Sequence, residues 1–95
     1  MQPSLKSDLI FIQLLCNPEY IQFLYKNNWF FNPKNIKYLK FLEYLRNKPY
    51  KYLIVYPQAL SLIVILQNEN IIEKLADDNF IKMIVEQHHY ININR

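Results

Sequence analysis

Few side chains in this sequence combine the residue types and spacings that a catalytic or metal site requires. His88 and His89 are adjacent, so on a helix they would point about 100° apart and could not easily bind one metal ion. His88 projects onto the apolar side of its expected helix, where a histidine packed at the edge of the core is the simpler interpretation. Asp77 and Asp78 precede the same helix and are better explained as its cap than as a catalytic carboxylate pair.

Candidate nucleophiles are equally scarce. Cys16 is the single cysteine, has no basic neighbour in sequence to lower its pKa, and is expected to be a small buried hydrophobe. It cannot form an intrachain disulfide, which fits a reducing compartment but does not distinguish cytosol from nucleus. The chain has no glycine, which argues against phosphate-binding loops. We therefore expect a protein that is not an enzyme and that binds no cofactor, metal or small-molecule substrate.

The whole chain has a net charge of +3, and its positive charge is concentrated in the middle of the sequence. The stretch from residue 34 to 51 interleaves aromatic residues with one acid, Glu43, and six bases: Lys34, Lys37, Lys40, Arg46, Lys48 and Lys51. Such a stretch can contact the backbone and bases of nucleic acids. Nearly all the cations are lysine, however, and no nucleic-acid-binding motif is evident. A solvated helix face is the simpler interpretation, and a small basic nucleic-acid-binding domain is the alternative function.

Capping signals divide the chain into helices. Asn17-Pro18-Glu19 and Asn32-Pro33 each combine an N-cap asparagine with a proline at the first helical position, and Ser7 or Asp8 can cap an earlier helix. Apolar periodicity predicts helices over residues 9–16, 18–26, 33–46, 57–67 and 80–91, with short helices or turns over 49–54 and 69–76. We expect a compact all-α bundle of about four main helices plus one or two short ones. It would form a single domain over residues 1–95, with its core at about 8–91.

Residues 56–67 form the most hydrophobic segment. As a helix they are apolar on almost every side, so the helix would lie in the middle of the bundle. A buried strand is the rival interpretation, because residues 62–66 form a continuous apolar run with three β-branched members. The helix is favoured, since a lone strand would have no partner for its backbone. No apolar run approaches the roughly 20 residues that span a bilayer, and the first residues lack a signal-peptide pattern.

The expected buried faces can be read from the helical period. In helix 33–46, Ile36 and Tyr44 fall on the polar side with Lys37, Lys40 and Glu43. The buried side of that helix is predicted to hold Tyr38, Leu39, Phe41, Leu42 and Leu45. The buried side of the last helix is predicted to hold Phe80, Ile81, Met83, Ile84, Val85 and Ile91.

Aromatic residues are the strongest functional signal. They make up 16% of the chain, and the hydrophobic share is 52%, so the chain has more apolar surface than its own core requires. Trp29-Phe30-Phe31 lies in a connection that could close the end of the bundle, and the tyrosines between residues 38 and 56 are too many for so small a core. Clustered aromatic residues form shallow grooves that receive extended, proline-containing peptides. The candidate partner-binding residues are Trp29, Tyr44, Tyr50 and Tyr56.

Three blocks of this sequence resemble the Mediator complex subunit 31 family. They run from Asn17 to Leu24 (NPEYIQFL), from Tyr38 to Tyr44 (YLKFLEY), and from Tyr56 to Leu60 (YPQAL), the last followed by Leu66-Gln67. The resemblance covers residues 9–90, and the three blocks occur in register. Two positions depart from the family pattern: Leu45, where the family usually has tryptophan, and Ala59, where cysteine is common.

The resemblance implies an all-helical, non-enzymatic subunit of the Mediator middle module, a nuclear coactivator of RNA polymerase II transcription. It also implies a specific partner besides the other middle-module subunits. This is the N-terminal part of Mediator subunit 7, which in the family lies extended, with proline-rich sequence, along the helical domain. Direct binding to nucleic acid or to a membrane is not expected.

Overall fold

The computed structural model is all-α, as predicted, and describes the backbone of residues 4–93 and the side chains of residues 4–86. Its α-helices are α1 (Leu5–Leu14), α2 (Pro18–Lys26), α3 (Pro33–Phe41), α4 (Gln58–Ile65), α5 (Glu69–Glu73) and α6 (Asp78–Ile93). Its 3-10 segments are η1 (Trp29–Phe31), η2 (Leu42–Arg46), η3 (Tyr50–Leu53) and η4 (Lys74–Ala76). Residues 4–93 contain no helix that is both long and apolar enough to cross a membrane.

Asparagine caps begin several helices where the sequence predicts them. The side chains of Asn17 and Asn32 accept hydrogen bonds from backbone N–H groups two residues later, at the starts of α2 and α3. Asn68 caps α5 in the same way, and Asp77 accepts from the N–H of Asn79 at 2.9 Å. In this chain without glycine, Asn28 adopts the left-handed conformation (φ 61°) between α2 and η1. These local signals therefore fix most of the helix starts.

The first helix begins earlier than predicted. Ser4, not Ser7 or Asp8, is its cap, and the Ser4 side chain accepts a hydrogen bond from the N–H of Ser7. Asp8 lies inside α1 and is only 2% exposed. The prediction that Asp8 could cap this helix is thus wrong, because the carboxylate is used for contacts within the fold.

The predicted helix 33–46 changes its winding near the middle. It is α-helical to Phe41 and continues to Arg46 as the 3-10 segment η2. A 3-10 helix advances about 120° per residue instead of about 100°, so after three residues the direction has shifted by about 60°. Tyr44 is accordingly half-buried and packs against the core. Ile36 also packs against the core, contrary to its predicted place on the polar side, but it lies in the α-helical part and the change of winding does not account for it. Phe41, predicted to be buried, is 46% exposed.

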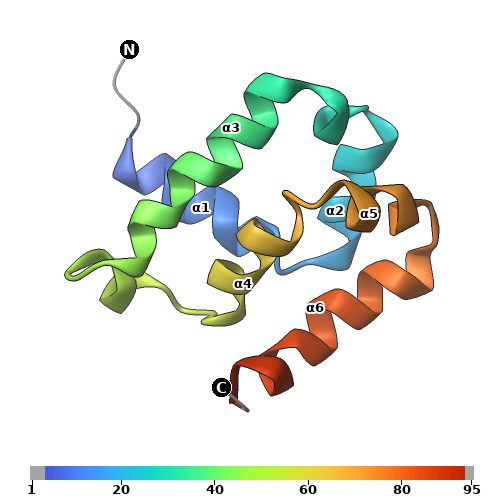
Figure 1. The fold of residues 1–95 in the computed structure, drawn as a ribbon. Helices are drawn as coiled ribbons and strands as arrows, with labels where there is room; N and C mark the ends of the chain where they lie inside the picture. Colours follow the sequence, from blue (N-terminus) through green and yellow to red (C-terminus); the bar gives the residue numbers. More distant parts are fainter. Residues whose placement is uncertain (1–3, 94–95) are drawn as a thin grey trace.

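The core lies where α1, α2, α3, η2, α4 and α6 meet. Figure 1 shows α4 near the middle, and α4 contacts α1, α3, η2 and α6. Its buried residues are fully enclosed and are Ala59, Leu62, Ile63 and, at its end, Leu66. Val64 is 41% exposed. The prediction that this helix is surrounded on all sides is therefore wrong. Small domains bury a smaller share of their surface than large ones, which fits the exposure of one face of α4.

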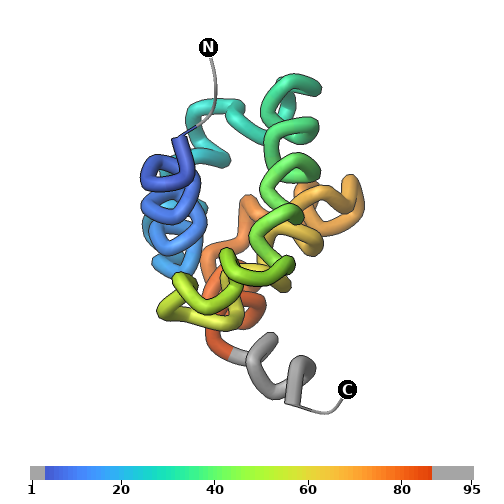
Figure 2. The backbone as a smooth tube through the Cα atoms, turned by 90° about the vertical axis from the view of Figure 1, so that its left-hand side faces the viewer, coloured from blue at the N-terminus to red at the C-terminus, as the bar shows by residue number. Residues whose placement is uncertain are grey.

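The other faces largely follow the sequence pattern. Figure 2 shows α1 and α2 on one side of the molecule and α3 on the other. In α6 Ile81, Ile84 and Val85 are buried, but Met83, predicted to join them, is 44% exposed.

The predictions for the side chains of His88, His89 and Ile91 lie outside the described residues. Leu45 and Ala59, where the sequence departs from the family pattern, are both fully buried.

Candidate partner-binding surface

Six aromatic rings form a continuous line of contacts across five elements, from η1 through α1 and α3 to η2 and η3. Neighbouring ring centroids in this line lie 5.1–6.3 Å apart, within the range of favourable aromatic pairs. We call this line the aromatic strip, and its members in order of contact are Trp29, Phe11, Tyr38, Phe41, Tyr44 and Tyr50.

The helical period explains how the strip is built. Tyr38, Phe41 and Tyr44 follow one another at a spacing of three residues, which places them along one side of α3 and η2. Phe11 from α1 contacts both Tyr38 and Trp29, with ring centroids 5.4 Å apart in each case, and so joins Trp29 to this helical row. Tyr50 in η3 packs edge-on against Tyr44 at 5.2 Å. The strip is therefore assembled by tertiary contacts around one short helical row.

A buried carboxylate lies beside the middle of the strip. Asp8 is 2% exposed and accepts hydrogen bonds from the Tyr38 hydroxyl, at 2.5 Å, and from the Tyr44 hydroxyl, at 2.8 Å. Burial, and then the hydrogen bond and negative charge of Asp8, raise the pKa of Tyr44 to about 12. The same causes raise the pKa of Tyr38 even further. Both phenols therefore stay protonated and donate to Asp8, which fixes the orientation of their rings.

Three of the four candidate residues are brought together. Trp29, Tyr44 and Tyr50 are half-buried members of the strip. Tyr56 is 46% exposed and lies beyond η3, outside the aromatic contacts that form the strip. Phe41 is an additional candidate that the sequence did not suggest, because its helical position predicted a place in the core. The signal that could have found it is the three-residue aromatic spacing from Tyr38 to Tyr44.

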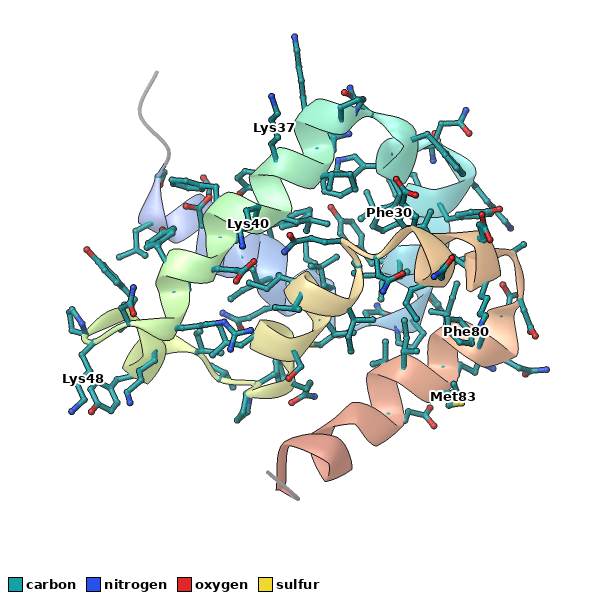
Figure 3. All side chains as sticks on the ribbon, viewed as in Figure 1. Phe30, Lys37, Lys40, Lys48, Phe80 and Met83 are labelled. Atoms are coloured by element: carbon teal, nitrogen blue, oxygen red, sulfur yellow. The ribbon has the colours of Figure 1, made fainter. Side chains whose placement is uncertain are left out.

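The lysines of the possible basic face lie in two groups. Lys34, Lys37 and Lys40 are exposed at three-residue intervals along α3, and Lys40 is 3.5 Å from Glu43. Lys48 and Lys51 are exposed around η3. Figure 3 shows the Lys48 side chain at the outer edge of the molecule, away from Lys37 on α3. The two groups are thus distinct features of the surface.

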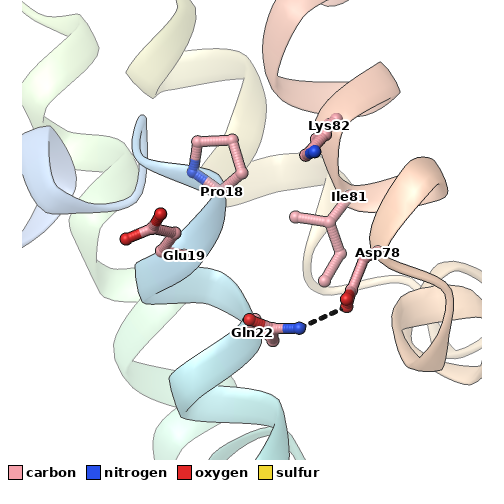
Figure 4. Close-up of a pocket in the computed structure, with 6 residues that line it drawn as sticks. All are labelled: Pro18, Glu19, Gln22, Asp78, Ile81 and Lys82. Carbon is pink, nitrogen blue, oxygen red and sulfur yellow. Dashed lines mark hydrogen bonds between the residues drawn. The ribbon is translucent and has the colours of Figure 1, made fainter.

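Two concavities are lined by residues outside the strip, although Phe30 in the larger one packs against Trp29, with ring centroids 5.2 Å apart. A groove of about 590 Å³ between η1, α3 and α5 is lined by Phe30, Phe31, Pro33, Ile36, Lys37, Gln67, Glu69, Ile72 and Glu73. A smaller, more polar pocket of about 180 Å³ lies between α2 and α6. Across that pocket Gln22 donates a hydrogen bond to Asp78, which helps to hold the two helices together (Figure 4).

The described side chains offer little for catalysis. Burial raises the pKa of the Cys16 thiol to about 11, and its Sγ donates to the carbonyl of Ile12 at 3.7 Å. The thiol is therefore protonated at neutral pH and is a poor nucleophile. Among the described residues, no group of three or more His, Cys, Asp or Glu side chains could hold a metal ion.

In this small all-α fold a line of aromatic rings, five half-buried and one exposed, borders the core, and aromatic side chains of this kind anchor contacts between proteins. The family model Med31, described as SOH1, matches residues 2–94, and the chain belongs to this family.

Relatives from distant eukaryotes carry the name Mediator of RNA polymerase II transcription subunit 31. The protein from Cryptococcus neoformans is 36% identical over 87 residues, which cover 88% of this chain and 48% of the relative. The Arabidopsis thaliana protein is 43% identical over 63 residues, covering 66% of this chain and 32% of the relative. The Schizosaccharomyces pombe protein is 29% identical over 83 residues, covering 87% of this chain and 60% of the relative. The chain thus spans about a third to three fifths of the length of these relatives.

Proposed function

We propose that this protein is a non-enzymatic subunit of the Mediator complex and acts in RNA polymerase II transcription in the nucleus. The support is its membership of the Med31 family, whose named relatives are Mediator subunits. Its partners would be other Mediator subunits of the middle module.

We further propose that the aromatic strip binds an extended, proline-containing segment from the N-terminal part of Mediator subunit 7. The observation that carries this proposal is the unbroken contact of six rings from Trp29 to Tyr50. Proline-rich segments are extended before they bind and pack against aromatic surfaces, so they lose little entropy on binding. Phe41, at 46% exposed, offers the most accessible ring of the strip to such a segment.

Asp8 prepares this surface before the partner arrives. Its two hydrogen bonds hold the Tyr38 and Tyr44 rings in place, while Phe11 supports Tyr38 from α1. Rings that are already ordered lose less conformational freedom on binding, which favours affinity. Tyr56, outside the strip, would at most contact the end of the bound segment near η3.

The experiment that tests this function is co-expression of the chain with an N-terminal fragment of Mediator subunit 7. The two should copurify, and the fragment should raise the melting temperature of the chain. A ligand at 100 times its Kd stabilises the folded state by about 2.7 kcal/mol. The control is the same fragment with its prolines replaced by alanine, which should bind less well. An unchanged melting temperature at saturating fragment would contradict the proposal.

A further inference from the structure

A second surface, around η3, carries exposed apolar and basic residues that the strip does not include. Among the residues with described side chains, eleven large hydrophobic residues are exposed, and four of them fall within residues 52–56. Tyr52 is 68% exposed, Leu53 49%, Val55 66% and Tyr56 46%. With the neighbouring cations they form what we call the η3 patch, made of Arg46, Lys48, Lys51, Tyr52, Leu53, Val55 and Tyr56.

The fold does not account for the apolar residues of this patch. No residue of η3 is buried, and of residues 51–56 only Ile54 packs against the core. Single exposed apolar residues are common on protein surfaces, but a contiguous group of them marks an interaction site. We therefore treat the four exposed apolar residues within 52–56 as the centre of a candidate interface.

The charged side chains of the patch itself are all cations, and the acid just before them in sequence, Glu43, lies close enough to Arg46 to interact with its charge. Arg46, Lys48 and Lys51 are all exposed, and residues 44–68 contain no aspartate or glutamate. The Arg46 guanidinium donates to the carbonyl of Leu60 at 3.2 Å, which holds it at the edge of the patch. The Lys51 ammonium lies 5.4 Å from the centre of the Tyr52 ring. An apolar centre is thus bordered by cations with no acidic neighbour in this stretch.

We infer that the η3 patch binds a short acidic segment with apolar side chains, supplied by a partner protein. Its apolar side chains would pack on Leu53 and Val55 and on the two tyrosines, while its carboxylates would pair with the three cations. The argument for this partner is charge complementarity, which speeds association and selects the partner. Nucleic acid fits less well, because Leu53 and Val55 offer neither stacking nor charge and only one of the cations is arginine.

The probe for this inference is a fluorescein-labelled 12-residue peptide of alternating aspartate and leucine, mixed with the full chain and followed by anisotropy. Its matched controls are a peptide with serine for leucine and one with lysine for aspartate. Only the peptide that is both acidic and apolar should bind well, and its affinity should fall as salt is added. Equal binding of the serine peptide would overturn the inference, because charge alone would then suffice. So would tighter binding of a DNA duplex that depends on Lys48 and Lys51.

Substitutions locate the site. Val55→Ser and the double change Lys48→Glu/Lys51→Glu should each weaken peptide binding about tenfold or more, as expected for central interface residues. Val64→Ser on α4 and Lys34→Glu/Lys37→Glu on α3 are the matched controls and should change it little. Circular dichroism should show that each variant stays folded. Equal losses in the control variants would overturn the assignment to the η3 patch.

The η3 patch adjoins the end of the strip at Tyr50, but the two binding proposals can be tested separately. Val55→Ser should leave binding of the subunit 7 fragment intact, and Phe41→Ala in the strip should leave binding of the acidic peptide intact. If the acidic peptide binds and the subunit 7 fragment does not, only the proposed role of the strip is contradicted. If the subunit 7 fragment binds and the acidic peptide does not, only the inference about the η3 patch is contradicted.

Discussion

The Tyr44 hydroxyl donates a 2.8 Å hydrogen bond to Oδ2 of Asp8, which lies 36 residues earlier in the chain. The other carboxylate oxygen accepts from Tyr38 at 2.5 Å. A single buried side chain thus joins α1 to α3 and η2 and orders the middle of the aromatic strip. The two phenol hydroxyls donate side-chain hydrogen bonds to both oxygens of this carboxylate.

Replacing Asp8 should destabilise the fold. Asp8→Ala removes the acceptor for both hydroxyls and should lower the free energy of unfolding by about 2 kcal/mol. Asp8→Asn keeps the shape and an acceptor oxygen and should cost about 1 kcal/mol. Urea unfolding followed by circular dichroism would measure both. Glu73→Gln, at an exposed carboxylate of α5, is the control and should change stability by less than about 0.5 kcal/mol. Equal stability of Asp8→Ala and the control would contradict the bonding described.

Alkaline pH should unfold the protein partly through these phenols. The pKa of Tyr44 is raised from 10.0 to about 12 in the fold, so the folded state holds its proton more tightly than the unfolded state. The stability from this group is complete below pH 10 and is lost as the pH rises through about 12. The measurement is the free energy of unfolding against pH, with tyrosinate absorbance recorded in parallel. In the double variant Tyr38→Phe/Tyr44→Phe, the free energy of unfolding should fall less steeply over that pH range. An unchanged slope would contradict a contribution from these two phenols.

Two neighbouring positions on α4 test its orientation. Leu62→Ala should lower the free energy of unfolding by about 3 kcal/mol, because Leu62 is fully buried. Val64→Ala removes methyl groups from a residue that is 41% exposed and should cost less than about 1 kcal/mol. Thermal and urea unfolding of the two variants would compare them directly. Similar losses would mean that α4 is enclosed on all sides, as its sequence alone suggests.

Tyr44 has a structural role as well as a proposed binding role. Tyr44→Ala should lower the free energy of unfolding by about 2 kcal/mol, because the half-buried ring packs on Phe41 and Tyr50 and binds Asp8. Tyr44→Phe keeps the ring and should cost about 1 kcal/mol. A chemical unfolding curve would distinguish the two. Loss of less than half a kcal/mol in the alanine variant would place Tyr44 on a free surface, as its helical position suggests.

Local signals were enough to predict the helical class and most helix starts. Asn17-Pro18 and Asn32-Pro33 specify their caps within three residues, so tertiary structure has little to add. The start of α1 could not be predicted this way. Asp8 resembles a cap in sequence, and its partners Tyr38 and Tyr44 are 30 and 36 residues away.

The site was harder to predict than the fold. Aromatic composition predicted Trp29, Tyr44, Tyr50 and Tyr56 as candidates, and Tyr56 lies outside the strip. The connection of the other three through Phe11 depends on how α1 packs beside α3. The exposure of Phe41 could not be derived from an ideal helical period, since it depends on which neighbours the fold places around it. The change to 3-10 winding at Leu42 likewise altered the direction of Tyr44.

The central claim, that the aromatic strip binds the subunit 7 segment, is tested most directly by two phenylalanines. Phe41 in the strip is 46% exposed and Phe31 in the groove beside α5 is 59% exposed, so they form a matched pair. The measurement is the Kd of the N-terminal subunit 7 fragment, followed by the fluorescence of Trp29, the only tryptophan of the chain. The account predicts that Phe41→Ala raises the Kd about tenfold or more and that Phe31→Ala leaves it nearly unchanged. A large effect of Phe31→Ala with none from Phe41→Ala would contradict it and would place the segment in the groove.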